Sequence, residues 1–348
     1  MDMPMTNRER LLTTLAHREP DRIPLGYDAW HEIDKQLFAR YGVSDRLGLF
    51  AAMGIDGFSV FEDNYAAPRF VGPKRKTPDG RDADMYGGAG QEFCPLAFAE
   101  SVADLDRHEL PRVEWFDFSA VRSRCDAIHA RGDVTVGGEG GCGIQHAINM
   151  RGYERALMDP LAEPAFTHAY MERLAAFMHD WNESWLAAGA FDIFRCGDEL
   201  GSMTTMHCSP AVWREFYKPY LAHAWAPARR RGLHIWFHCC GYLRPCLEDL
   251  IEMGVTMWDP APPTVRDNDL PELKRRYGKQ ITFVGGVDQP RVLVEGTVAD
   301  VQREVRLRIE QLAPGGGYVL GPSQVFTGDV PIDNIVAMYE TALKHGRY

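Results

Sequence analysis

Eight short segments rich in apolar and β-branched residues alternate along this chain with longer amphipathic segments. Such an alternation is typical of repeated strand–helix units, in which helices cover a parallel sheet. Eight units of this kind predict an α/β fold, a (β/α)8 TIM barrel, formed as a single domain by residues 1–348. The expected strands are Ile23–Tyr27, Gly57–Phe61, Val134–Gly138, Ile193–Cys196, His234–His238, Val255–Trp258, Ile281–Val284 and Tyr318–Gly321.

Several of the intervening segments carry clear helix signals. Pro210–Arg231 follows Ser209, a residue type that caps helix N-termini, and Thr297–Leu312 starts with another such residue. Pro331–Lys344 begins with proline, which the first helical turn tolerates. Asn7–Ala16 spaces its leucines as a helix does, so we expect an N-terminal helix before the barrel.

Residues 62–115 interrupt the alternation with a stretch rich in proline, glycine and charged residues. Loops of this length are uncommon as plain connections and usually serve a function of their own. Alternating segments at Arg69–Arg75 and around Asp84–Tyr86 indicate paired extended strands. We therefore expect an inserted hairpin after the second strand that covers the barrel mouth as a lid.

An open, doubly wound sheet would show the same alternation. A dinucleotide-binding sheet needs the pattern Gly-x-Gly-x-x-Gly directly after its first strand. The chain has Gly26-Tyr27-Asp28-Ala29-Trp30 at that place, which cannot hold a pyrophosphate closely. The barrel is therefore favoured.

Charge and composition exclude several classes of partner. The formal net charge of −11 argues against a nucleic-acid partner, because binding to phosphates requires a basic face. No run approaches the roughly 18 apolar residues of a membrane span, and Met1–Pro20 has no apolar core of the kind that secretory signals contain. The eight cysteines have no regular spacing, which fits reduced thiols. We expect a cytoplasmic protein with a small-molecule substrate.

Barrel enzymes carry their reacting groups on the loops that follow the strands, so polar residues at these places are candidates. We expect catalytic roles for Asp198, Glu199, His238 and Asp288. Substrate contacts are expected from Tyr27, Trp30, Glu62, Glu139 and Gln324. Two alternatives stay open, because acids such as Asp198 and Glu199 also cap helices, and Gly285-Gly286-Val287-Asp288 also fits a tight strand exit.

The sharpest local pattern is Phe237-His238-Cys239-Cys240-Gly241. A histidine and a cysteine two residues apart at a strand end place nitrogen and sulfur near one point, as zinc requires. Glu199 on the adjacent strand would supply an oxygen, so the expected zinc ligands are Glu199, His238 and Cys240. The spacing alone equally fits a half-buried histidine with cysteines that act as small apolar residues.

Several short motifs of the chain resemble those of a known family. They are Gly197-Asp198-Glu199-Leu200-Gly201, Ser209-Pro210, His238-Cys239-Cys240-Gly241, Gly285-Gly286-Val287-Asp288 and Gly315-Gly316-Gly317-Tyr318. With them the chain resembles the uroporphyrinogen decarboxylase superfamily, which also contains zinc-dependent methyltransferases that work with corrinoid proteins. The resemblance runs through almost the whole chain and implies the barrel fold.

Within the superfamily, the chain is more similar to the methyltransferases. The decarboxylases carry an Arg-Gln-Ala-Gly-Arg segment after strand one, whereas this chain has Asp28-Ala29-Trp30-His31. Asp28, Glu62 and Asp63 would repel a macrocycle that bears many carboxylates. A decarboxylase is therefore the alternative function.

The methyltransferase branch places a His-x-Cys pair at strand five, on which His238 and Cys240 fall, and a further cysteine after strand eight. Gln324 stands at that last place, so Glu199, Cys239 or another group completes the zinc site, or zinc does not bind. The resemblance implies methyl transfer between an O-, N- or S-methyl substrate and a corrinoid.

The chain lacks the Asp-x-His-x-x-Gly motif that binds corrinoids, so cobalamin would arrive on a partner protein or free. The resemblance also implies pairing of barrels into a homodimer. A barrel that binds a corrinoid or small molecule without converting it is a second alternative.

Overall fold

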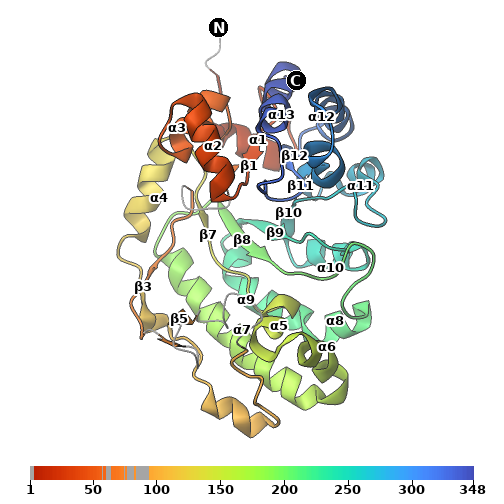
Figure 1. Ribbon diagram of the computed structural model, residues 1–348. Coiled ribbons are helices and arrows are strands. Elements are labelled where there is room, and N and C mark those ends of the chain that lie inside the picture. The colour runs from red at the N-terminus through yellow and green to blue at the C-terminus, as the bar shows by residue number, and fades with distance from the viewer. Residues whose placement is uncertain (1–3, 57, 60–63, 74, 77–81, 84–93) are drawn as a thin grey trace.

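The computed structural model describes residues 4–56, 58–59, 64–73, 75–76, 82–83 and 94–348 (Figure 1). In these residues the strands of the main parallel sheet lie at the centre of the molecule and helices surround them, while β3 (Arg69–Phe70) and β5 (Asp82–Ala83) lie at its edge (Figure 1). Six strands form one parallel sheet in the order β12-β11-β10-β9-β8-β7. Their bounds are β7 Val136–Gly137, β8 Ile193–Gly197, β9 His234–His238, β10 Val255–Asp259, β11 Thr282–Val287 and β12 Tyr318–Pro322.

Two further strands close this sheet into a ring. β1 (Gly26–Tyr27) pairs in parallel with β2 (Phe58–Ser59). Leu25, just before β1, forms a parallel bridge to Leu320 of β12, and Tyr65, which follows β2, bridges to Val136 of β7. The expected eight-stranded barrel is therefore confirmed.

Most expected strand positions are confirmed, and the largest difference is at β11, which extends past Val284 to Val287. Gly285 and Gly286 stay in register with Leu320 and Gly321 of β12 instead of forming a turn. Gly285 has a φ of 95°, and a Cβ atom there would lie 2.3 Å from the carbonyl oxygen of Pro260. The glycines thus allow close packing of neighbouring strands.

Thirteen α-helices lie within the described residues. They are α1 Asn7–Leu15, α2 His31–Tyr41, α3 Arg46–Met53, α4 Val121–Ala130, α5 Ile144–Arg151, α6 Tyr153–Ala162, α7 Pro164–Ala187, α8 Pro210–Phe216, α9 Lys218–Arg230, α10 Leu247–Glu252, α11 Leu270–Tyr277, α12 Val298–Leu312 and α13 Ile332–His345. The expectation of one helix over Pro210–Arg231 is wrong, because the helix is interrupted at Tyr217, between α8 and α9. Pro219 cannot donate a backbone N–H, so the second helix starts afresh.

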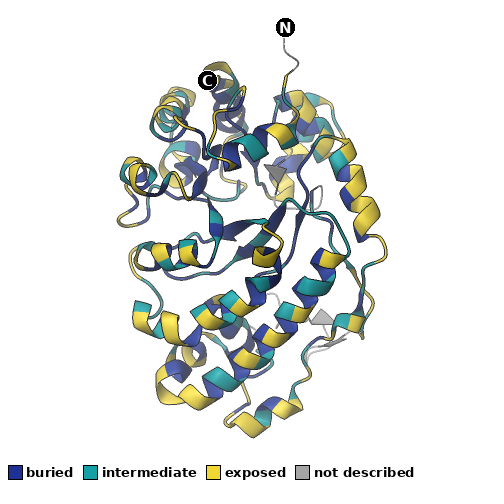
Figure 2. Cartoon of the chain, turned by 180° about the vertical axis from the view of Figure 1, so that it is seen from behind, coloured by how far each residue is buried: buried dark blue, intermediate teal, exposed yellow. Residues whose placement is uncertain are grey.

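The N-terminal helix α1 closes the end of the barrel at which the strands begin. Thr6 and Glu9 form a capping box at the start of α1. Leu11 and Leu15 of α1 pack on side chains that fill the barrel interior, among them Trp236 and Met257. Figure 2 shows the central strands buried, while the surrounding helices expose their outer faces. The opposite end of the barrel, at the carboxyl ends of the strands, is not covered by α1 and can hold a functional site.

The described part of the insertion contains two short antiparallel pairs. β3 (Arg69–Phe70) pairs with β6 (Phe116–Asp117), and β4 (Arg75–Lys76) pairs with β5 (Asp82–Ala83). Arg151 at the end of α5 donates hydrogen bonds to the carbonyl oxygens of residues 96 and 99, which anchors the insertion there. A lid function over residues 62–115 stays a prediction, since several of these residues lie outside the described part.

None of the helices in the described residues is long and apolar enough to cross a membrane.

Candidate active site

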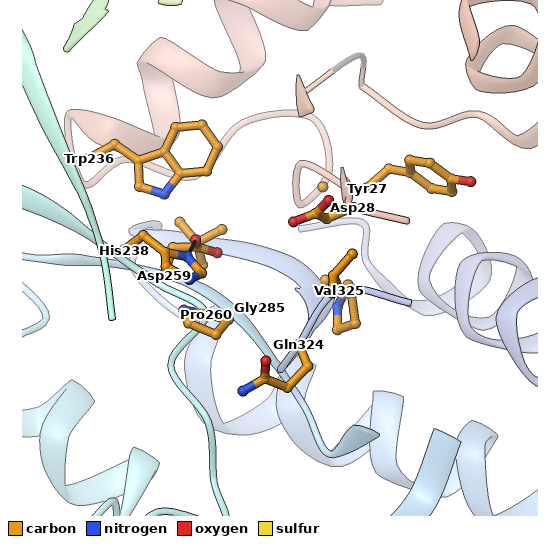
Figure 3. Close-up of a pocket in the computed structure, with 13 residues that line it drawn as sticks. Tyr27, Asp28, Trp236, His238, Asp259, Pro260, Gly285, Gln324 and Val325 are labelled. Carbon is orange, nitrogen blue, oxygen red and sulfur yellow. Dashed lines mark hydrogen bonds and ion pairs between the residues drawn. The ribbon is translucent and has the colours of Figure 1, made fainter. Parts of the chain in front are cut away.

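A pocket opens at the carboxyl ends of the barrel strands (Figure 3). Its walls come from β1, β9, β10, β11 and β12 and from the segments that follow them. The lining residues are Gly26, Tyr27, Asp28, Trp236, His238, Asp259, Pro260, Val284, Gly285, Gly321, Pro322, Gln324 and Val325. This is the end of a barrel at which catalytic groups gather.

His238 is held between an acid and a thiol. It is the register partner of Asp259 on the neighbouring strand, and its Nδ1 lies 2.5 Å from Asp259 Oδ2. Its other ring nitrogen, Nε2, lies 3.2 Å from the Sγ of Cys240. Burial lowers the pKa of His238, but the Asp259 carboxylate and the Cys240 contact outweigh burial and raise this pKa to about 10. The imidazole orientation is thereby fixed, with Nε2 toward the sulfur.

Asp259 is a site residue that the sequence analysis missed. It ends β10 and directly follows the sixth expected strand, so the rule that barrel sites gather at strand ends would have found it. Trp236 was missed too. It lies two residues before His238 on β9, and the period of two places both side chains on the inner face of the barrel.

The arrangement around His238 fits two ligands of a zinc site. Nitrogen and sulfur 3.2 Å apart can bind one ion, since zinc bonds to them measure about 2.0 and 2.3 Å. A histidine that binds a metal usually donates its other N–H to a carboxylate, the position that Asp259 holds. Gln324 Oε1 lies 3.5 Å from Cys240 Sγ and adds an oxygen donor. Gln324 is therefore a candidate third ligand beside His238 and Cys240.

Glu199 does not join this set as expected. Among the described residues, no three His, Cys, Asp or Glu side chains gather closely enough to hold a metal ion, which includes Glu199 with His238 and Cys240. The Glu199 carboxylate instead lies beside the backbone of Gly241, where a Cβ atom would be 2.4 Å from Oε1. Burial raises the pKa of Glu199 to about 7, against the opposing effect of His238.

Asp198 caps a helix. Its buried carboxylate accepts hydrogen bonds from the backbone N–H groups of Ile144, Gln145 and Glu199, at 3.0, 2.8 and 3.0 Å. The first two begin α5, so Asp198 joins the end of β8 to that helix. Burial raises the pKa of Asp198 to about 6, although these donors act in the opposite direction. We therefore give Asp198 a positioning role.

Asp288 is also engaged outside the pocket. It is buried, and its Oδ1 accepts from the backbone N–H of Arg291 at 3.1 Å, where it caps the short helix Gln289–Val294. Residues 285–287 thus end β11, with no tight turn at the two glycines, and Asp288 caps the helix that follows.

Of the two aromatic residues expected to contact the substrate, Tyr27 is part of the pocket lining and Trp30 is not. Tyr27 is buried and its ring points away from the cavity (Figure 3), with its hydroxyl donating to Asp34 Oδ1 at 2.6 Å. Trp30 is 55% exposed and precedes α2, outside the residues that line the pocket.

The expected acidic substrate contacts differ in position. Glu139 follows β7, and its Oε1 accepts from the N–H of Gly140 at 3.2 Å, outside the pocket lining. Glu62 lies outside the described residues. Gln324 lines the pocket as expected.

Comparisons with known proteins agree with this architecture. A model of the uroporphyrinogen decarboxylase family matches residues 84–345. A methyltransferase from Methanosarcina mazei has a TM-score of 0.62 at 17% sequence identity, and the similarity covers 98% of this chain and 99% of that one. 3-Keto-D-glucoside 4-epimerase from E. coli reaches a TM-score of only 0.35 at 16% identity, over 74% of this chain and 97% of that one. None of the curated proteins compared matches the chain.

Proposed function

Because the chain belongs to the uroporphyrinogen decarboxylase family, we propose that it is a methyltransferase with the barrel fold of this family. It moves a methyl group between a small O-, N- or S-methyl substrate and a corrinoid. The observation that carries the proposal is the line of contacts Asp259–His238–Cys240 at the pocket. The chain is also similar in structure to a methyltransferase from Methanosarcina mazei, which is a further reason to choose this reaction.

The chain's own residues would prepare a metal and orient the substrate. Zinc would be held by His238 and Cys240, with the amide oxygen of Gln324 as the third donor. When bound, zinc supplies a Lewis acid to the heteroatom that carries the methyl group. Asp259 fixes the imidazole, because its hydrogen bond to Nδ1 leaves Nε2 free for the metal.

The pocket suits a small substrate better than a carboxylate-rich macrocycle. Asp28 and Asp259 both line it, and acidic side chains offer no positive charge to bind the carboxylates of such a macrocycle. Trp236, Val284 and Val325 add apolar wall. The corrinoid would be the second reactant, bound by a separate protein or free.

Methyl transfer to reduced cobalamin tests the proposal. The purified protein is incubated with zinc, cob(I)alamin and methyl donors of three classes, a methoxy-aromatic, a methylamine and a methyl thioether. We expect methylcobalamin, detected by its absorbance, from at least one class. His238→Ala should lose this activity, whereas His31→Ala, on the exposed start of α2, should keep it.

Other outcomes decide between the alternatives. Release of CO2 from uroporphyrinogen, without methyl transfer, would replace the proposal by a decarboxylase. Binding of cobalamin without turnover of any donor would favour a binding barrel.

A further inference from the structure

Asp28 lines the pocket with a carboxyl group whose Oδ1 has no hydrogen-bond partner among the described residues. It follows β1 directly, and its carboxylate points into the cavity from the wall across from His238 and Asp259 (Figure 3). Its Oδ1 is buried and has no hydrogen-bond partner. A buried acceptor without a partner is costly, so such an atom in a ligand pocket indicates a group that meets the ligand.

None of the described charged groups around Asp28 forms a hydrogen bond to its buried Oδ1. Burial raises the pKa of Asp28, the Asp259 carboxylate raises it further, and the result is about 6 despite the opposing effects of Arg195, His238 and Arg46. Arg46, on α3, is committed to Asp34, with its Nη2 2.7 Å from Oδ2.

In the described part of the chain, two further neighbours of Asp28, Tyr339 and Arg195, form no hydrogen bond to its carboxylate, and the Nε of Arg195 is itself buried without a hydrogen-bond partner. The hydroxyl of Tyr339 on α13 donates to the carbonyl oxygen of Gly26 at 2.7 Å. The Arg195 guanidinium on β8 lies 5.5 Å from the centre of the Trp236 ring. Neither forms a hydrogen bond to Asp28 among the contacts of the described residues.

The pocket thus contains two acids with different surroundings. Asp259 is paired with His238 at 2.5 Å, whereas Asp28 has no such partner. Carboxyl groups in one site whose environments differ in this way commonly divide their roles, one as a fixed charge and the other as a proton carrier.

We propose that Asp28 passes a proton to the heteroatom from which the methyl group departs. The inference rests on the proposed methyl transfer and adds a catalytic residue to it. A methyl ether, amine or thioether is a poor methyl donor because its leaving group is a strong base. An acid within hydrogen-bond reach of that heteroatom lowers the barrier.

The bond between the methyl carbon and the heteroatom breaks, and its electron pair stays on the heteroatom. The methyl carbon forms a bond with the electron pair of the nucleophilic acceptor, while the carboxyl proton of Asp28 moves to the heteroatom. The products are the methylated acceptor, the demethylated alcohol, amine or thiol, and the Asp28 carboxylate, which regains a proton from water.

Donors with different leaving groups test this role. A methyl sulfonium donor releases a neutral thioether and needs no proton, whereas a methyl ether does. We expect Asp28→Asn to lose methyl transfer from the ether on the order of 10²- to 10⁴-fold and to keep transfer from the sulfonium near the parent rate. Glu32→Gln, which removes the same charge at the exposed side of α2, should change neither rate.

A second readout does not depend on methyl transfer. Difference infrared spectra between the parent and Asp28→Asn should contain a protonated-carboxyl band that disappears as the pH rises through about 6. Absence of this band would overturn the proposal.

The two donors also separate the two claims. Equal losses with the ether and the sulfonium, or no loss with either, would overturn the role of Asp28 and leave the methyltransferase standing. Failure of the parent protein with every donor would overturn the proposed function, and the proton transfer with it.

Discussion

His238 and Asp259 are register partners on β9 and β10, and their Nδ1 and Oδ2 atoms lie 2.5 Å apart. This contact decides which ring nitrogen of His238 faces the pocket. Because Asp259 accepts the hydrogen bond at Nδ1, Nε2 is turned to Cys240. A strand pairing formed by the barrel itself therefore positions the candidate metal site.

Asp259→Asn should weaken zinc binding by about 10- to 100-fold, as loss of a carboxylate partner to a ligating histidine does. The amide keeps the shape but loses the charge that holds the imidazole. Competition with a chromophoric chelator measures the affinity. Asp126→Asn, the same change on the exposed face of α4, should leave the affinity as it is. Equal affinities for Asp259→Asn and the parent would refute the orienting role.

Gln324→Cys should tighten zinc binding, by about tenfold or more. A thiolate is a stronger zinc ligand than an amide oxygen, and the Gln324 side chain already lies 3.5 Å from Cys240 Sγ. The same chelator competition gives the result, and Gln324→Ala, which removes the donor, should bind more weakly than the parent. An affinity unchanged in both variants would mean that this side chain does not face the metal.

Asp28→Asn should stabilise the protein at high pH. The pKa of Asp28 rises from 3.8 to about 6 on folding, so the parent's contribution from this group is present below pH 3.8 and is lost as the pH rises through 6. The variant should be more stable at pH 8 by up to about 3 kcal/mol, with the gain shrinking toward pH 4. Urea unfolding at a series of pH values measures it, and a gain independent of pH would contradict the burial argument.

Asp198→Ala should destabilise the fold by about 1–3 kcal/mol, because it leaves the first N–H groups of α5 without acceptors. Zinc affinity should stay near that of the parent. Denaturant unfolding combined with the chelator assay separates these effects. Full stability with lost zinc binding would contradict the capping role and indicate that Asp198 acts on the metal site.

The sequence predicted the barrel because its signal is repeated: eight expected strands, most of them followed by a segment with helical spacing. It also predicted that His238 and Cys240 converge, since both belong to one strand end. It could not predict where an acid at a strand end would point. Asp198 meets a helix that begins 54 residues earlier in the chain, and only the folded arrangement brings its carboxylate to that helix. The sequence likewise could not show that the Glu199 carboxylate lies beside the backbone of Gly241 and does not gather with His238 and Cys240.

Metal content tests the central claim most directly. The purified parent and His238→Ala are loaded with zinc, freed of excess metal by gel filtration and analysed by mass spectrometry. We predict one zinc ion per chain in the parent and none in His238→Ala. A parent that retains no zinc, or a variant that retains as much as the parent, would contradict the account.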